Sequence, residues 1–316
     1  MISEFCRAVA FSYPLSEVDF HRRQAYVPRP NGWSEMDAIE FIKMHGLGND
    51  FVVIDGRARD LRLTAAQVTA IADRHIGIGC DQLIVLETPP PGSNGAAADI
   101  FMRIYNQDGS QSDACGNATR CISSLLMAES GGTAINVQTG AGILATGSTD
   151  DGRVSVDMGP VNTDWRAIPL AEETDTANLP VEVDGLARPI AVNVGNPHMI
   201  FFVDDADAAP IDEHGPALEH HPLFPERTNV QMAQVLSPDR IRLKTWERGV
   251  GRTAASGSSA CATLAAAHIR GLTGRRAEIV MDGGSLDIEW RDDNRVVQIG
   301  PVATSFRGTI DPSLLG

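Results

Sequence analysis

The sequence contains very little lysine. Of its 26 basic residues only two are lysines, Lys43 and Lys244. A pyridoxal-phosphate enzyme holds its cofactor as a Schiff base on a lysine, so this cofactor has few possible attachment points. Acidic residues outnumber basic ones, and the formal net charge is -15. Because binding to phosphates needs a basic face, this charge argues against a nucleic-acid partner.

Motifs for nucleotides and metals are also missing. The chain has no G-x-x-x-x-G-K-[S/T] loop, no H-E-x-x-H helix and no paired C-x-x-C motif. The runs GLGND and IGIGCD lack the third glycine and the following helix of a dinucleotide site, so we expect no cofactor. His214, His220 and His221 come closest to a histidine cluster. They lie in a loop-like, proline-flanked stretch that favours a solvated surface, and we expect no metal.

Long apolar segments and a disulfide framework are absent too. The longest apolar runs, such as residues 199–203, are strand-length, so we expect no contact with a membrane. Five cysteines, an odd number, do not form a disulfide framework in a chain of 316 residues. They fit a reducing cytoplasm. Residues 1–36 have no continuous apolar core, so we interpret them as a disordered N-terminal extension rather than a signal peptide.

What the chain does contain is a pattern that occurs twice. Residues 106–121 read NQDGSQSDACGNATRC, and residues 245–261 read TWERGVGRTAASGSSAC. In both, a glycine-containing turn precedes an A-[C/S]-G segment and then an alanine-rich run that is typical of a helix. Cys115 stands at the mouth of the first helix and Ser256 at the mouth of the second.

Short β-branched and aromatic runs surround these helices and predict strands. A Gly-Asn pair precedes one strand in each half, because Asn49 lies 66 residues before Cys115 and Asn196 lies 60 before Ser256. A further helix is predicted over residues 65–75, with Thr64 as its N-cap. We expect an α+β fold of two β-rich halves, each wrapped on a central helix, with the site in the cleft between them.

A cysteine at a helix N-terminus is expected to have a lowered thiol pKa, since the unpaired N–H groups and the helix dipole favour an anion. The same N–H groups can bind a carboxylate. Inversion at the α-carbon of an amino acid needs a base on one face and an acid on the other. Two helix N-termini that face each other across a bound amino acid could supply both groups. The alternative for Cys115 is a small buried core residue, which is what we expect Cys121 and Cys261 to be.

Taken together, the motifs resemble those of the diaminopimelate epimerase family. The matching segments are MHGLGNDF (44–51), RHIGIGCDQ (74–82), N-x-D-G-S…C-G-N-A-x-R-C (106–121), VGNPH (194–198), RTNVQ (227–231) and WERGVG (246–251). The resemblance implies an α+β fold of two pseudosymmetric β-barrel-like domains, each wrapped on a central helix. The expected domains are residues 37–158 together with 301–316, and residues 159–300. The resemblance implies as well a cofactor-independent interconversion of L,L- and meso-diaminopimelate for lysine and peptidoglycan synthesis. It also implies a homodimer with Phe306 at the contact, although a lone aromatic residue after a strand is equally typical of a core.

The same resemblance assigns roles to individual residues. Cys115 matches one of two catalytic thiols, and His198 and Glu247 match residues that tune the thiols. The matched substrate-binding positions are Asn49, Gln82, Asn106, Gly116, Asn117, Asn196, Asn229, Glu247, Arg248, Gly257 and Ser258.

Ser256 departs from the family pattern, because it occupies the position of the second catalytic cysteine. A hydroxyl is a much weaker acid than a thiol. Three explanations are open. The serine is an engineered substitution, or it is a natural change that impairs activity or limits it to one direction. The third explanation is that the chain is a relative with another substrate or chemistry. We favour the epimerase, since the motifs that bind the amino-acid substrate are intact. The alternatives are a proline-, hydroxyproline- or histidine-type racemase, epimerase or dehydratase, and an amino-acid-binding protein without turnover.

Overall fold

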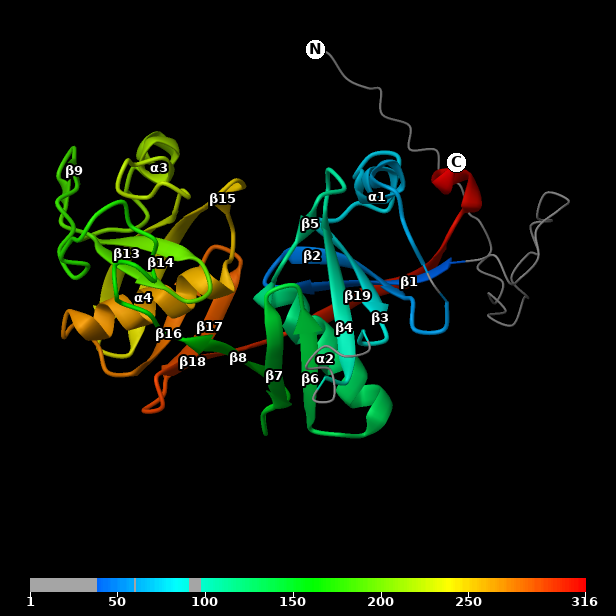
Figure 1. The fold of residues 1–316 in the computed structure, drawn as a ribbon. Helices are drawn as coiled ribbons and strands as arrows, with labels where there is room; N and C mark the ends of the chain where they lie inside the picture. The colour runs from blue at the N-terminus through cyan, green and yellow to red at the C-terminus, as the bar shows by residue number, and fades with distance from the viewer. Residues whose placement is uncertain (1–38, 60, 91–97) are drawn as a thin grey trace, which may run out of the picture. The chain divides into compact units, whose positions relative to one another are not determined.

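The computed structural model describes residues 39–59, 61–90 and 98–316, and the predicted N-terminal extension, residues 1–36, lies outside these ranges. Within them the chain forms a 17-stranded mixed sheet, a two-stranded sheet and four α-helices (Figure 1). The expected α+β fold, dominated by strands with few helices, is confirmed. None of the described helices is long and apolar enough to span a membrane.

The first half of the large sheet has an order of parallel and antiparallel strand pairs that recurs in the second half. Strands β1 and β2 pair antiparallel, β2 and β3 parallel, β3 and β4 antiparallel. Strand β4 then pairs antiparallel with β5 and parallel with β6, and β7 and β8 follow antiparallel. The bounds are β1 (Ile39–Gly46), β2 (Asn49–Asp55), β3 (Gln82–Glu87), β4 (Ile100–Asn106), β5 (Gln111–Ser112), β6 (Ala134–Thr139), β7 (Gly142–Ser148) and β8 (Val154–Pro160).

The second half repeats this order of pairings from β11 to β18, strand by strand and with the same directions. The duplication inferred from the two helix mouths therefore extends to the hydrogen-bonding pattern of the sheet. The bounds are β11 (Ile190–Asn193), β12 (Pro197–Phe202), β13 (Asn229–Ser237), β14 (Arg240–Glu247), β15 (Gly251–Thr253), β16 (Arg276–Met281), β17 (Gly284–Trp290) and β18 (Arg295–Gly300).

Three strands lie outside the repeat. The short strands β9 (Glu182–Val183) and β10 (Leu186–Ala187) pair with each other. Strand β19 (Ala303–Ile310) returns to pair antiparallel with β1, and the chain ends in the short helix η3 (Pro312–Leu315).

The two halves are joined through equivalent strands, because β8 pairs antiparallel with β18. Gly142 and Gly284 begin the equivalent strands β7 and β17. Val156 and Gln298 each lie 14 residues beyond these glycines, and they are register partners of each other. A position that pairs with its own equivalent marks a local twofold relation between the halves.

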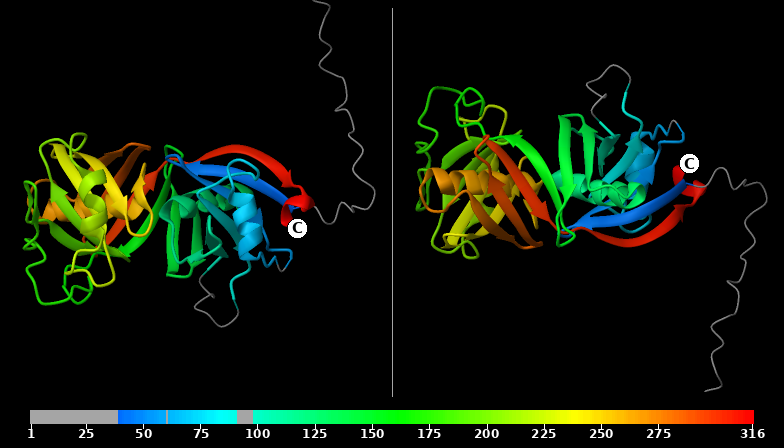
Figure 2. Two further views of the ribbon diagram at one scale, coloured as in Figure 1. Left: turned by 90° about the horizontal axis from the view of Figure 1, so that it is seen from above. Right: turned by 90° about the horizontal axis from the view of Figure 1, so that it is seen from below.

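Helices α2 (Gly116–Ser130) and α4 (Gly257–Ile269) are equivalent, and each packs against the strands of its own half (Figures 1 and 2). Helix α4 is buried on every side, which is why it consists mostly of alanine and other small residues. The predicted core positions Cys121 and Cys261 are both 0% exposed. Burying a side chain such as Leu264 stabilises the fold by about 1.5–3 kcal/mol.

Helix α1 (Ala65–Ala72) begins where the sequence predicts. The Thr64 hydroxyl accepts from Gln67 N at 3.3 Å, and the Gln67 side chain accepts from Thr64 N at 3.0 Å, which forms a capping box. The predicted run continued to His75, but the helix ends at Ala72. The Asp73 backbone is extended, and its carboxylate accepts from the backbone N–H of His75.

Helix α3 (Ile211–Glu219) was not expected, and the loop-like interpretation of this stretch is wrong. Pro216 lies inside the helix and Gly215 beside it, and both residues disfavour helix. The helix forms because Ile211 and Leu218 are buried in a core shared with strands β12 and β13. A Cβ on Gly215 would lie 2.6 Å from the Trp246 ring, so the glycine allows close packing there.

Candidate active site

Cys115 is the N-cap of helix α2, with an extended backbone at φ -153° and ψ 108°. Its thiol is partly buried and lies 3.8 Å from the Oδ1 atom of Asn49, to which it donates a weak hydrogen bond. Asn117, in the first turn of the helix, donates to the same oxygen at 3.1 Å. Asn49 comes from the start of β2, so two segments 66 residues apart meet at the first mouth.

The expected lowering of the Cys115 pKa is wrong in its net direction. Burial raises the pKa of this thiol to about 11, and the negative charge of Glu247 adds to the rise. The helix N–H groups of Ala118 and Asn117 and the charge of Arg120 do lower it, as helix-mouth chemistry requires, but desolvation outweighs them. Cys115 is therefore a protonated thiol at neutral pH in the ligand-free protein.

Ser256 is the N-cap of helix α4, with φ -140° and ψ 118°, close to the geometry of Cys115. Its hydroxyl accepts from Ser259 N at 3.4 Å and donates to Oε2 of Glu247 at 2.8 Å. Burial raises the pKa of Glu247, while the nearby Thr253 hydroxyl and the hydrogen bond from Ser256 oppose the rise. The second mouth thus carries a hydroxyl joined to a carboxyl group that holds its proton more tightly than usual.

Both helix N-termini approach the same buried side chain, that of Gln298 on β18. A Cβ on Gly116 would lie 2.1 Å from its Nε2 atom, and a Cβ on Gly257 would lie 2.3 Å from its Oε1 atom. Gln298 is 0% exposed. Only glycine at the first position of each helix leaves room for this approach. The close contact with Gln298 therefore explains why both predicted substrate-binding positions, Gly116 and Gly257, are glycines.

Arg120 lies inside the matched motif C-G-N-A-x-R-C, but no role was assigned to it from the sequence. It is 0% exposed, and its Nη1 atom donates to Gln298 Oε1 at 2.8 Å while its Nη2 atom donates to Asn117 Oδ1 at 2.7 Å. A charged residue inside the apolar run of α2 is the signal that marks it, since such residues are seldom fully buried. Its contact with Gln298 spans 178 residues and has no signature in the sequence.

The Asn49 amide group is anchored by a network of charged side chains on the side away from the Cys115 thiol. Its Nδ2 atom donates to Asp81 at 2.9 Å, and Arg74 bridges Asp81 and Asp50, each at 2.7 Å. Lys43, which is buried, pairs with Asp50 at 2.6 Å. Burial opposes the change, but hydrogen bonds from Arg74 and Lys43 lower the pKa of Asp50 to about 2. The amide that contacts the thiol is therefore fixed in orientation.

Gln82 and Asn106 meet across the β3–β4 pair, in direct register. Gln82 Nε2 donates to Asn106 Oδ1 at 3.1 Å, and Asn106 Nδ2 donates to Ser110 at 3.1 Å. Among the described residues Gln82 Oε1 has no hydrogen-bond partner, although it is buried. A buried acceptor left without a partner is a suitable contact for a substrate ammonium group.

Asn196 and His198 lie together at the start of β12. His198 is 0% exposed, and its Nε2 atom lies 2.7 Å from Asn196 Oδ1. Burial lowers the pKa of His198 to about 3, so the ring is neutral at pH 7. The two residues form one unit, in which the histidine fixes the amide.

Asn229 pairs with His198 in the β12–β13 register and uses both ends of its amide. Nδ2 donates to the Pro197 carbonyl at 2.8 Å, and Oδ1 accepts from Arg248 N at 3.0 Å. Arg248 is partly buried and donates from Nη1 to the Glu226 carbonyl at 3.2 Å. Ser258 follows Gly257 in the first turn of α4 and is partly buried.

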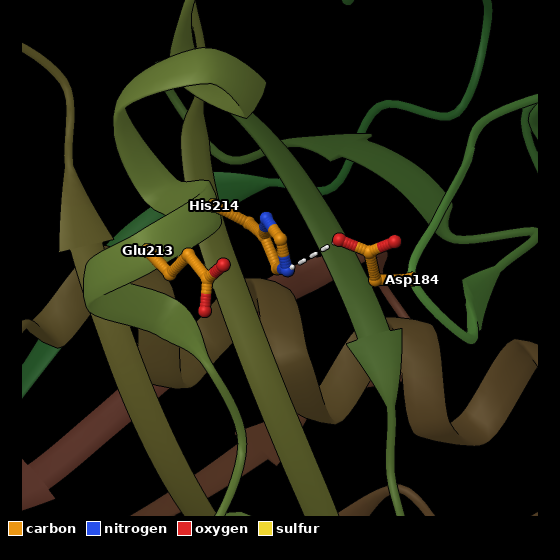
Figure 3. A group of neighbouring side chains, drawn as sticks. All are labelled: Asp184, Glu213 and His214. Carbon is orange, nitrogen blue, oxygen red and sulfur yellow. Dashed lines mark ion pairs between the residues drawn. The ribbon is translucent and has the colours of Figure 1, made fainter.

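The histidine stretch gives a different result for each residue. His214 is buried on α3 and lies 3.4 Å from Asp184, which corrects the expectation of a solvated side chain (Figure 3). One ligand atom of each of His214, Asp184 and Glu213 lies within 4.8 Å of the others, but both carboxylates are exposed. We interpret this group as a surface ion pair. His220 is exposed, as expected, and His221 is partly buried.

A family model supports the assignment that the motifs suggest. The model described as diaminopimelate epimerase matches residues 41–163 and 190–305. The chain belongs to the diaminopimelate epimerase family.

Curated relatives of this family cover most of the chain. It is 54% identical over 275 residues to a diaminopimelate epimerase of Rhodospirillum centenum, covering 87% of this chain and 93% of the relative. It is 52% identical over 278 residues to one of Acidiphilium cryptum, covering 88% and 98%.

Solved structures support the epimerase fold. A hydroxyproline epimerase from Agrobacterium vitis has a TM-score of 0.62 at 16% identity and covers 88% of this chain and 95% of its own. A predicted epimerase from Pseudomonas aeruginosa has a TM-score of 0.61 at 18% identity, covering 86% and 99%. At these identities the likeness concerns the fold alone.

Proposed function

We propose that this chain is an isomerase, a diaminopimelate epimerase that interconverts L,L- and meso-diaminopimelate without a cofactor in lysine and peptidoglycan precursor synthesis. Relatives that are half identical over most of the chain have this name. The observation that carries the proposal is the pair of equivalent helix mouths, Cys115 and Ser256, whose helices both start against Gln298.

The first half-reaction uses Cys115. Its thiolate takes the α-proton of the bound amino acid, and the electrons of the C–H bond move into the substrate carboxylate. N–H groups at the starts of α2 and α4 stabilise the negative charge that develops there. The thiol is neutral before substrate binds, because burial raises its pKa to about 11, so its own proton must leave to solvent before the thiolate can take the α-proton. A bound zwitterion brings an ammonium charge into the site, which favours the thiolate.

The second half-reaction returns a proton from the opposite face. Ser256 donates its hydroxyl proton to the α-carbon. Glu247, whose Oε2 atom accepts from this hydroxyl at 2.8 Å, replaces that proton when it is in its acid form. The new C–H bond is formed, one Ser256 O–H bond is broken and remade, and Glu247 is left as a carboxylate. The raised pKa of Glu247, caused by burial, increases the fraction of protonated acid that can supply this step. In the reverse direction the same groups remove the proton.

Diaminopimelate has an amino-carboxylate group at both ends, so a second carboxylate must be recognised. Arg248 is our candidate, since its guanidinium offers a planar fork that matches carboxylate oxygens. Asn229 holds the Arg248 backbone with Oδ1 and is tied to Pro197 with Nδ2. Asn229 then acts on this carboxylate chiefly by fixing the segment that carries Arg248.

We also propose a cytoplasmic homodimer with Phe306 at the contact. Phe306 is 49% exposed on β19, which argues against the alternative of a core residue. Among the described strands β19 pairs only with β1, so its other edge is open. Phe306 packs edge-on against Phe41 at 5.8 Å between ring centroids. An exposed aromatic on an open strand edge is suited to contact a second copy.

Incubation with L,L-diaminopimelate in D₂O tests the function, with α-proton loss and stereochemistry followed together. An epimerase incorporates deuterium and forms the meso isomer. An amino-acid-binding protein without turnover gives neither. Faster reaction with L-proline, trans-4-hydroxy-L-proline or L-histidine than with diaminopimelate would overturn the substrate and leave the fold standing.

A further inference from the structure

We propose that Arg120 is a positioning residue of this site, which ties the first turns of α2 and α4 together through Gln298 and places a buried positive charge on the Cys115 side. The inference rests on the proposed acid–base role of Cys115. It gives a role to a residue that the matched motif contains but to which no role was assigned.

The first argument is the contact geometry. Arg120 donates to Gln298 at 2.8 Å, and the Gln298 amide lies where a Cβ of Gly116 or Gly257 would stand. It also donates to Asn117 at 2.7 Å, whose amide shares the Asn49 oxygen with the Cys115 thiol. One guanidinium therefore reaches the first residues of both helices through Gln298, and the Cys115 thiol through Asn117 and Asn49.

The second argument is the absence of a counter-ion. In the part of the chain that the structure describes, Arg120 has only amide hydrogen-bond partners, and its Nε atom has none. A buried charge without an opposite charge is costly to fold. The groups whose negative charge would stabilise Arg120 are thiols, namely Cys121, Cys115 and Cys261. Of these only Cys115 is partly exposed and lies at a helix mouth.

The third argument comes from the duplication. Arg120 lies four residues after Gly116, and its equivalent, four after Gly257, is the buried apolar Cys261. Gln298 is likewise equivalent to the apolar Val156, its register partner. The polar pair occurs once, at the junction between the halves. The positive charge of Arg120 therefore has a different effect on Cys115, at the N-terminus of α2, than on Ser256, at the N-terminus of α4.

The direction of this asymmetry follows from the charges that face Cys115. Arg120 on α2 favours its thiolate, and Glu247 at the end of β14 opposes it when it is in its carboxylate form. Asn49 from β2 contributes an uncharged amide oxygen. Without Arg120 the thiol would face only the opposing carboxyl group and its own helix N–H groups. Arg120 thus makes Cys115 the side on which negative charge is stabilised.

The test compares Arg120→Lys with Arg120→Met, because the two side chains have similar length and differ in charge. Iodoacetamide labelling of Cys115 is followed between pH 7 and 10, with each cysteine resolved by peptide mapping. We expect labelling to be about tenfold slower in Arg120→Met than in the wild type at each pH, and close to wild type in Arg120→Lys. Turnover falls in both variants, since neither retains the forked contact with Gln298 and Asn117. Arg153→Met, which removes a surface ion-paired arginine, serves as the control.

Equal labelling rates in the Lys and Met variants would mean that Arg120 only fills space, and the proposal would be overturned. If Arg120→Met does not fold, Gln298→Glu gives the same information with a side chain of the same size. It places a carboxylate against the guanidinium, and Cys115 labelling should slow to a similar extent, whereas an unchanged rate counts against the proposal. Labelling does not require turnover. A protein that shows the Lys–Met difference but no α-proton exchange keeps this inference and loses the proposed function.

Discussion

At the scale of residues, the N-cap side chains of α2 and α4 differ in one atom, which is sulfur in Cys115 and oxygen in Ser256. Both residues have the same backbone geometry as N-caps, but only Ser256 donates to a carboxyl group. The thiol can work alone as base and acid, whereas an alkoxide is too unstable to persist at neutral pH. Glu247 therefore matters more in this chain than it would beside a cysteine.

Replacing Ser256 by Cys is expected to raise the rate of epimerisation by about one to two orders of magnitude. A thiol is the stronger acid, and one positioned acid–base group contributes about 10²–10⁴-fold. Rates of meso-diaminopimelate formation in the two proteins check this. An unchanged rate would mean that the serine is adequate or that the reaction is different.

Glu247→Gln is the matched control for that variant. In the serine protein the amide cannot supply a proton, so turnover should fall at least tenfold. In a Ser256→Cys background the same change should cost much less, because the thiol carries its own proton. Equal losses in both backgrounds would show that Glu247 does not act through Ser256.

Substrate choice is predicted from Arg248. L-Lysine lacks the second carboxylate, so turnover of L-lysine should be severely weakened relative to diaminopimelate, by about 10³-fold or more, since the buried donors would stay unpaired. Arg248→Lys keeps the charge but loses the fork and should raise KM for diaminopimelate more than it lowers kcat. Comparable turnover of L-lysine and diaminopimelate would remove Arg248 from this role.

Motif residues were predictable because each occurs in a short, distinctive segment around a turn or a helix start. Gln298 was not, since its partners Arg120 and Gly257 are distant in sequence and a glutamine in a strand has no local signature. The sign of the Cys115 shift was also missed. Helix-mouth electrostatics can be derived from the sequence, but the desolvation that outweighs them depends on what packs around the thiol.

At the scale of elements, the first residues of α2 and α4 have no space for a side chain. Gly257→Ala would place a Cβ 2.3 Å from Gln298, so the helix start or the amide must move. We expect a loss of stability of about 1–3 kcal/mol and a larger fall in kcat than in substrate affinity.

Gly274→Ala is the control, because a Cβ at that position meets no atom within 4 Å. Denaturant unfolding and steady-state kinetics of the two variants check the prediction. Similar behaviour of both would mean that the close approach to Gln298 is not required.

Elements differed in how far local sequence determined them. The α1 start was correct because its capping box, Thr64 and Gln67, is a local device. Helix α3 was missed because Gly215 and Pro216 disfavour a helix locally. The helix is stabilised instead by burial of Ile211 and Leu218 against strands that are distant in sequence. The strand pairing across β8 and β18 likewise depends on a contact that no single segment encodes.

At the scale of the whole molecule, buried thiols make the fold sensitive to base. Burial raises the pKa of Cys121 and of Cys261 to about 12, above the ordinary value of 9.0. The folded state therefore keeps these protons where the unfolded state loses them. Their contribution to stability is fully present below pH 9 and is lost as pH rises from about 9 toward 12.

The free energy of unfolding should therefore fall above pH 9, by up to about 1.4 kcal/mol per pH unit for each such thiol. Urea denaturation between pH 7 and 10.5 measures the slope. Cys261→Ala should flatten it, whatever its effect on stability at pH 7. A slope that is the same in wild type and variant would rule out this source of base sensitivity.

The proposed homodimer is tested with two exposed apolar residues. Phe306 is 49% exposed and Leu236 is 48% exposed, so glutamate at either position disturbs the monomer to a similar extent. Sedimentation at micromolar concentration should give a dimer for the wild type and Leu236→Glu, and a monomer for Phe306→Glu. A wild-type mass of 33.8 kDa, that of one chain, would reject the dimer.

The pairing of Val156 with its own equivalent, Gln298, has a consequence for how such a protein can change over generations. In a homodimer made of two copies of one half, paired through this same strand, every mutation would appear on both sides of the bound amino acid at once. A continuous chain with both halves is free of that restriction, because each position is inherited separately. Arg120 can then stand opposite Cys261, and Ser256 opposite Cys115, without either change being copied onto the other side.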